Sequence, residues 1–214
     1  DGGQVLYPLV ADDWLPSSEL VGNVEAALAS SGGEALPSID LGGYAVLAGS
    51  KKGVSHLLSH LPQVRVGNVT YPIRLAQHGP YHTALASPVA SAAHAEFADL
   101  RFHVPHTSLI DGHGRIFSPW SADLKELKSY TLGSQVTEPY NFTASVRVAL
   151  REFAPDHVVL PGPGNTLGGI VGQILIEERW RGIRSKADFL ESQRHPAGPG
   201  EGPFLISMGL VPES

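Results

Sequence analysis

The chain has 214 residues, of which 42% are hydrophobic and 17% charged, and its formal net charge is −6 at pH 7. This composition suits a globular protein with a sizeable core, and the lack of a basic stripe argues against a nucleic-acid partner. The absence of cysteine excludes disulfides, thiolate nucleophiles and cysteine-based metal sites. The lack of cysteine also fits a reducing cytosol, and we expect a cytoplasmic protein. No apolar run approaches the roughly 18 residues of a membrane span, so we expect no membrane partner.

Two helices are predicted in the first 75 residues, each with a serine at its start. Ser17 or Ser18 can accept a hydrogen bond from the first turn of one helix, which Gly32–Gly33 end. Ser50 can cap the second helix in the same way. A strand precedes the first helix, and Pro8 indicates an edge position for it, because proline donates no ladder hydrogen bond.

The strands of this region complete a known arrangement. Their order with the helices is strand, helix, strand, strand, helix, strand, which is typical of the ferredoxin-like βαββαβ arrangement. A Gly67–Asn68 turn can divide the last strand into a hairpin. We predict a ferredoxin-like small subdomain over residues 3–75 and a second portion over 76–214. The strands are expected over 4–10, 35–41, 44–49 and 63–75.

The second portion has an α/β character. An apolar strand at 157–161 is typical of strands buried in a parallel sheet, and a glycine loop and a helix follow it. Asp123 and Asn141 are N-cap candidates for two of the helices. The helices are predicted over 85–100, 124–131, 141–153 and 165–178, with short strands inside 103–121 and at 204–208.

The glycine loop could be taken for a dinucleotide fingerprint. It contains Gly162, Gly164 and Asn165, but Leu167 stands where the G-x-G-x-x-G pattern requires its last glycine. Pro163 removes one of the N–H groups that would face a phosphate. The loop is therefore better explained as a tight strand-to-helix turn than as a nucleotide site.

Two histidine pairs have spacings that could ligate zinc on a helix. His78 and His82 are four residues apart, and His103 and His106 are three apart. Glycine or proline interrupts both pairs, so neither lies on a regular helix face, and we predict no metal site. His82 lies in a turn before a helix, where loops often hold catalytic groups, and is a candidate general base.

A histidine base in a chain without cysteine needs a hydroxyl to activate. The hydrolase-type nucleophile elbow, G-x-S-x-G, occurs nowhere in the chain. The nearest stretch, residues 53–57, lacks the second glycine and lies inside a predicted helix. The chain thus offers a base without its nucleophile.

Four stretches, in the same order and spacing over about residues 40–175, carry a family resemblance. The chain resembles malonyl-CoA:acyl carrier protein transacylases and the related acyltransferase domains of polyketide synthases. The resemblance implies the C-terminal part of a hydrolase-like α/β acyltransferase domain, into which the ferredoxin-like subdomain is inserted. The four stretches are YAVLAG (44–49), QHGPYHTALASPVA (77–90), QVTEPYNFTASV (135–146) and HVVLPGPGNTLGGI (157–170).

The resemblance also implies roles for individual residues. His82 matches the catalytic histidine, which takes a proton from the serine nucleophile and later from the incoming thiol. Gln135 falls where a backbone carbonyl accepts a hydrogen bond from that imidazole and so orients it, as Asp does in a Ser-His-Asp triad. The candidate substrate-binding residues are Tyr81, Gly162, Gly164 and Asn165.

The implied reaction moves a malonyl-type group from coenzyme A to acyl carrier protein through a seryl ester. The family's G-x-S-x-G serine, a glutamine of the oxyanion hole and an arginine for the malonyl carboxylate all match positions upstream of Asp1. The partners are then acyl carrier protein and malonyl-CoA or a related acyl-CoA, with no cofactor beyond that thioester. Two alternatives stay open: an acyl hydrolase of the same architecture, and a carrier-protein-binding fragment without a nucleophile.

Two stretches depart from the family pattern. Asp40-Leu41-Gly42-Gly43 replaces an Asn-Ser-Pro segment that is common before the third strand of the small subdomain. Gly79-Pro80-Tyr81 precedes the histidine where the family usually has Pro-Ser or Ala-Phe. In the related synthase domains, the residues before the histidine track the choice between malonyl and methylmalonyl groups. Tyr81 therefore leaves the acyl group open.

Overall fold

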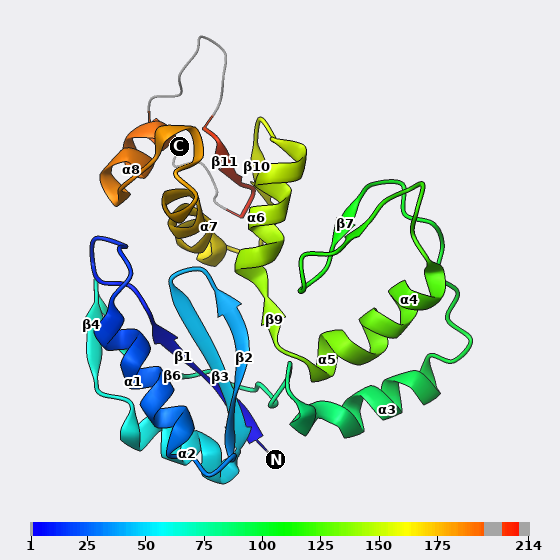
Figure 1. The fold of residues 1–214 in the computed structure, drawn as a ribbon, viewed down its shortest axis with the longest axis horizontal. Coiled ribbons are helices and arrows are strands. Elements are labelled where there is room, and N and C mark those ends of the chain that lie inside the picture. The colour runs from blue at the N-terminus through cyan, green and yellow to red at the C-terminus, as the bar shows by residue number, and fades with distance from the viewer. Residues whose placement is uncertain (1, 195–202, 210–214) are drawn as a thin grey trace.

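A computed structural model describes residues 2–194 and 203–209 and shows a mixed α/β protein (Figure 1). Its main sheet has five strands in the order β6-β1-β3-β2-β9. The first four pair antiparallel, and β9 joins β2 in parallel. The strands are β1 (Gly2–Pro8), β2 (Ala35–Leu41), β3 (Tyr44–Ser50), β6 (Ile73–Arg74) and β9 (Tyr140–Asn141).

Four of these strands confirm the ferredoxin-like arrangement, because β6, β1, β3 and β2 are the fourth, first, third and second strands of βαββαβ. The edge position expected for the first strand is wrong, since β1 lies between β3 and β6. Pro8 is tolerated because it is the last residue of β1, while β6 pairs only with Val5 and Leu6.

Both predicted serine caps are present. The Ser17 hydroxyl accepts from the Leu20 N–H (3.4 Å) at the start of α1 (Ser18–Ala29), and the Ser50 hydroxyl accepts from the Gly53 N–H (3.1 Å) at the start of α2 (Lys51–His60). The two helices cover one face of the sheet and enclose a core with it (Figure 1). Its most buried members are Val5, Tyr7, Leu47 and Leu57.

The last predicted strand is divided, as the Gly67–Asn68 turn indicated. β4 (Val64–Val66) and β5 (Val69–Tyr71) form an antiparallel hairpin, and Gly67 takes a left-handed φ of 60° in its turn. β6 then returns to the main sheet beside β1. The loop that carries His78 and His82 begins at the end of β6.

A second core surrounds α7 (Thr166–Glu177), in which every residue from Ile170 to Ile176 is buried. The helices α6 (Phe142–Phe153) and α8 (Lys186–Arg194) and two parallel strands, β10 (Val158–Leu160) and β11 (Leu205–Ser207), contribute to it. The Asn141 side chain caps α6 by accepting from the Ala144 N–H (2.7 Å).

Two features of this region differ from the prediction. β10 was expected to be fully buried, but Val159 is 48% exposed, because β11 is the only strand that pairs with β10 among the described residues. The helix α8 was not predicted. Its signals are a serine at its start, Ser185, whose hydroxyl accepts from the Asp188 N–H, and the buried Phe189 one turn later.

The segment between the two cores extends to the right in Figure 1. Its first helical part ends earlier than predicted, at Glu96, and the carbonyl oxygens of Ala98 (2.6 Å) and Leu100 (2.9 Å), which follow it, accept from the Lys128 ammonium. The elements are a 3₁₀ turn (Ala84–Ala86), α3 (Ser87–Glu96), β7 (Leu109–Ile110), β8 (Ile116–Phe117), α4 (Leu124–Ser129), a π-helical turn (Tyr130–Ser134) and α5 (Gln135–Thr137).

The turn Gly42–Gly43, where the chain departs from the family pattern, joins the sheet to the second core. The Gly42 N–H donates to Thr143 Oγ1 of α6 (2.8 Å), and the Gly43 N–H donates to Gln173 Oε1 of α7 (2.9 Å). Asp40 accepts a short hydrogen bond from the Thr143 hydroxyl. Asp40 therefore fixes the first turn of α6.

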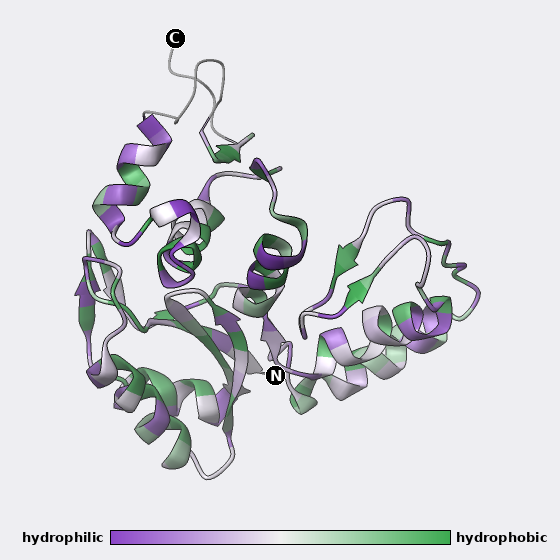
Figure 2. Cartoon of the chain, turned by 45° about the horizontal axis from the view of Figure 1, so that its top comes forward, coloured by the Kyte–Doolittle hydropathy of each residue, from purple (hydrophilic) through white to green (hydrophobic). Residues whose placement is uncertain are grey.

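No helix within residues 2–194 and 203–209 is both long enough and apolar enough to cross a membrane. The helices carry hydrophilic as well as hydrophobic residues (Figure 2).

An ion-pair network around the buried Glu178 carboxylate, between α6 and the end of α7, makes stability depend on pH. Glu178 is 6% exposed and accepts from Arg147 (2.5 Å) and Arg151 (2.6 Å). Burial raises the pKa of Glu178, but the hydrogen bonds from the two arginines outweigh it and lower the pKa. A lowered folded pKa means that the stabilisation is present above the unfolded value of about 4.3 and is lost as pH falls through the folded value.

We expect Glu178→Gln to lower the free energy of unfolding by about 1–2 kcal/mol at pH 7, because it leaves two arginines without their buried counterion. The difference from the unsubstituted protein should shrink below pH 4, as measured by urea denaturation across pH. Glu177→Gln is the control, since that carboxylate is 51% exposed and should cost less than about 0.5 kcal/mol. An equal effect of both substitutions would contradict this account.

Candidate active site

His82 occupies a strained position in the loop after β6. Its φ is 57°, a left-handed conformation that residues other than glycine rarely adopt. Its N–H donates to the Val136 carbonyl oxygen (2.8 Å), and its Nδ1 lies 2.6 Å from the Gln135 carbonyl oxygen. Because a carbonyl oxygen only accepts, Nδ1 carries the proton in this contact. When the imidazole is neutral, Nε2 then has the lone pair that a general base needs.

Pro139 explains why the Gln135 carbonyl is available. In a helix this oxygen would accept from the N–H of residue 139, and proline has none. The last helical bond runs instead from the Glu138 N–H to the Ser134 carbonyl (2.8 Å), and the chain then becomes extended. The π-helical turn before Gln135 and the proline after it therefore present two carbonyl oxygens, those of Gln135 and Val136, to His82.

Tyr140 limits the movement of the imidazole on another side. Its ring centroid lies 5.6 Å from that of His82, with a 54° angle between the planes. Gly112, in the β7–β8 turn, packs so closely on Tyr140 that a Cβ there would lie 2.4 Å from the ring. The Gly112 N–H donates to the Tyr130 hydroxyl (2.7 Å), and burial raises the pKa of that tyrosine, which keeps the hydroxyl neutral. Sequence reasoning missed Tyr140 and Gly112, although Asp-Gly is a turn signal.

Tyr81 and His78 lie beside His82 in the same loop. The Tyr81 side chain is 41% exposed and therefore accessible to a ligand, and its predicted role in substrate binding stays a prediction. The two imidazoles have different hydrogen-bond partners, since His78 Nδ1 lies 2.8 Å from Gln4 Oε1 and His82 Nδ1 lies 2.6 Å from the Gln135 carbonyl oxygen. Among the residues described, no three histidine, aspartate or glutamate side chains gather in a way that could hold a metal ion.

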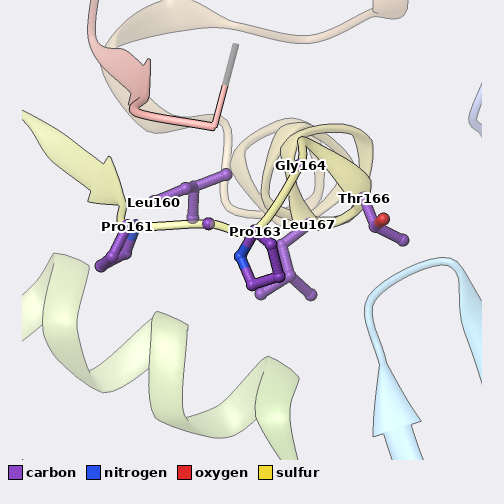
Figure 3. A pocket seen from close by; sticks show the side chains of 7 residues that line it. Leu160, Pro161, Pro163, Gly164, Thr166 and Leu167 are labelled. Atoms are coloured by element: carbon purple, nitrogen blue, oxygen red, sulfur yellow. The ribbon is translucent and has the colours of Figure 1, made fainter.

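The glycine loop has the conformation of a tight turn. Gly162 and Gly164 take left-handed φ values of 98° and 71°, which only glycine adopts readily. The loop lines a cavity of about 80 Å³ (Figure 3), well below the roughly 300 Å³ at which ligand pockets begin. Asn165 precedes α7, and its carbonyl accepts from the Gly168 N–H (3.0 Å).

No hydrogen bond within the described part of the chain joins the glycine loop to His82. Within residues 2–194 and 203–209, the hydrogen bonds of the loop region connect it to the β11 end, from the Met208 N–H to the Leu160 carbonyl and from the Ser207 hydroxyl to the Gly164 carbonyl. The hydrogen bonds of His82 reach only Gln135 and Val136. The substrate-binding role predicted for the loop stays a prediction, and Nε2 of His82 remains uncommitted in the described part of the chain.

Comparisons with known proteins bear on this geometry. No protein-family model matches the chain, and a search of curated proteins found no match. Solved structures do match. An acyl-carrier-protein S-malonyltransferase from Burkholderia pseudomallei superposes with a TM-score of 0.63 at 20% identity, over 81% of this chain and 52% of that one.

Two further structures agree with the first. FabD from Acinetobacter baumannii has a TM-score of 0.63 at 16% identity and covers 98% of this chain and 55% of its own. A complex of a type II polyketide synthase acyl carrier protein with its malonyl-transacylase has a TM-score of 0.63 at 19% identity, over 81% of this chain and 52% of that one. The chain therefore has the fold of these acyltransferases and spans about half of their length.

Proposed function

We propose that this chain is part of an acyltransferase that moves a malonyl-type group from coenzyme A to the phosphopantetheine thiol of acyl carrier protein. The observation that carries the proposal is the 2.6 Å hydrogen bond between His82 Nδ1 and the Gln135 carbonyl. It orients the imidazole and leaves Nε2 free, which is the arrangement of a general base. The fold shared with malonyl transferases supports this reaction class.

The proposed reaction has two transfers. His82 Nε2 takes the proton of a serine hydroxyl as its oxygen attacks the thioester, and the coenzyme A thiol leaves with a proton from the imidazolium. The carrier thiol then gives its proton to Nε2, its sulfur attacks the seryl ester, and the serine regains a proton. Each transfer breaks one acyl bond and forms another, so no cofactor beyond the thioester is needed.

The Gln135 carbonyl would stabilise the imidazolium in both transfers. Its partial negative charge is weaker than the full charge of the aspartate in a Ser-His-Asp triad, so it orients the ring more than it raises its basicity. The short contact and the tight packing by Tyr140 compensate by leaving the ring few other orientations. This favours precise alignment of Nε2 with the nucleophile.

The proposal needs a serine that the chain does not present in a G-x-S-x-G motif, and the family resemblance implies that this serine lies N-terminal to Asp1. A base whose Nε2 is uncommitted is consistent with a nucleophile from elsewhere. We place acyl carrier protein as the second substrate because the matched structures include a transacylase in complex with a carrier protein. The acyl group and the cytoplasmic location stay predictions, with Tyr81 beside His82 as the residue to test for acyl choice.

The product distribution tests the proposal against both alternatives. A protein that includes the segment N-terminal to Asp1 is incubated with malonyl-CoA and holo acyl carrier protein, and the products are separated by mass spectrometry. Transfer predicts malonyl carrier in large excess over free malonate. Malonate as the main product would contradict transfer and indicate the hydrolase. Carrier binding without release of coenzyme A would indicate the fragment that lacks a nucleophile.

A further inference from the structure

The peptide group between Tyr81 and His82 is held from both sides. Its N–H, from His82, donates to the Val136 carbonyl (2.8 Å). Its carbonyl, from Tyr81, accepts from Ser38 Oγ (2.9 Å) and from Gln4 Nε2 (3.3 Å). Gln4 belongs to β1 and Ser38 to β2, so the main sheet holds one edge of the peptide and the end of α5 holds the other.

The side chains of Gln4 and Ser38 are buried, and all their polar atoms are hydrogen-bonded. Gln4 is 2% exposed and Ser38 is 1% exposed. Gln4 Nε2 also donates to Ser38 Oγ (2.8 Å), while Gln4 Oε1 lies 2.8 Å from His78 Nδ1, which donates to it and so fixes which end of the amide faces Ser38. A buried amide is costly unless it is hydrogen-bonded, so this network has one preferred arrangement.

A strand irregularity sets the direction of Ser38. The pairing of β2 with β3 shifts between Pro37 and Ile39, which leaves Ser38 unpaired in a β-bulge. Bulges change the direction of a side chain within a sheet and are frequent next to functional sites. Here the bulge accompanies a serine that donates to the loop holding His82.

We propose that Gln4 and Ser38 are positioning residues for the His82 base. A left-handed φ at a residue other than glycine persists only where its surroundings fix it, and the four contacts of this peptide group and imidazole provide that. The inference rests on the proposed function, in which His82 is the base. It assigns to the ferredoxin-like sheet a direct part in aligning the imidazole with the Gln135 carbonyl.

The test is the ¹⁵N NMR spectrum of the His82 imidazole, which distinguishes the two neutral tautomers. In the unsubstituted protein we expect the Nδ1–H form to predominate. Ser38→Ala and Gln4→Met should each lower the ratio of Nδ1–H to Nε2–H tautomer about tenfold, the worth of about one hydrogen bond. Ser38→Thr keeps the hydroxyl and should keep the ratio.

Gln173→Met is the matched control. Gln173 is also buried, at 6% exposed, and its amide also holds a backbone turn, but that turn is Gly42–Gly43 and not the His82 loop. It should leave the tautomer ratio unchanged. An unchanged ratio in folded Ser38→Ala protein, or an equal change in the control, would overturn the inference.

Amide hydrogen exchange keeps the inference testable if a variant does not fold. In the unsubstituted protein, the His82 N–H must exchange at least about tenfold more slowly than that of the exposed Tyr81. Equal exchange rates would overturn the inference without any variant.

Neither measurement uses acyl-CoA. A tautomer shift in a protein without transferase activity would therefore refute the proposed function alone, whereas transfer with an insensitive tautomer would refute only this inference.

Discussion

His82→Ala is expected to slow malonyl transfer by roughly 10² to 10⁴, the usual worth of a positioned general base. The substitution removes the proton acceptor for both the serine and the carrier thiol, while the backbone contact from residue 82 to Val136 can remain. The measurement is the rate of malonyl-carrier formation at saturating malonyl-CoA, in a protein that includes the segment N-terminal to Asp1.

The control for this experiment is His106, a loop histidine that is exposed. His106 lies in an irregular segment away from the contacts of His82, and His106→Ala should change the rate less than about twofold. A His82→Ala rate within a few fold of the unsubstituted protein would remove His82 from the mechanism. A comparable loss in both variants would show that the effect comes from the fold.

Gly53→Ala is expected to lower the free energy of unfolding by about 3 kcal/mol, at the upper end of the usual cost of overpacking. Gly53 lies in the first turn of α2, and a Cβ there would stand 1.9 Å from the Glu34 carbonyl oxygen. Because the obstacle is backbone at the start of β2, the helix would have to move off the sheet. Urea denaturation followed by circular dichroism measures the change.

Gly22→Ala in α1 is the matched substitution with the opposite expected sign. A Cβ at Gly22 would meet nothing within 4 Å, so alanine should stabilise the helix by about 0.5–1 kcal/mol through its better helix propensity. The contrast separates steric contact from propensity. If Gly53→Ala also stabilised the protein, the packing of α2 against β2 described above would be wrong.

Local signals in the sequence predicted much of the fold. The caps at Ser17, Ser50 and Asn141 use hydrogen bonds between near neighbours, so residue type and spacing suffice to predict them. The ferredoxin-like order followed from the periodicity of apolar residues, and the strand pairing confirms it. Boundaries that depend on distant contacts were predicted less well, as at the end of α3, where Lys128 binds the carbonyls that follow Glu96.

The candidate site was only partly predictable for the same reason. The sequence alone made His82 a candidate base, and the family resemblance supplied Gln135. Gln4 and Ser38 donate to the carbonyl of Tyr81, the residue before His82, although they lie 77 and 43 residues away from Tyr81 in the chain. No local sequence pattern indicates contacts between residues so far apart. One signal for this contact could have been read from the sequence: Pro139 stands four residues after Gln135, where a continuing helix would need an N–H to donate to the Gln135 carbonyl.

The mass of the acyl-enzyme tests the central claim most directly. A protein that includes the segment N-terminal to Asp1 is mixed with malonyl-CoA, quenched in acid and weighed intact, and the modified residue is located by peptide mapping. We expect one malonyl group on the serine of a G-x-S-x-G motif, formed much more slowly in His82→Ala. An unmodified protein, or an adduct that forms equally fast without the imidazole, would contradict the account.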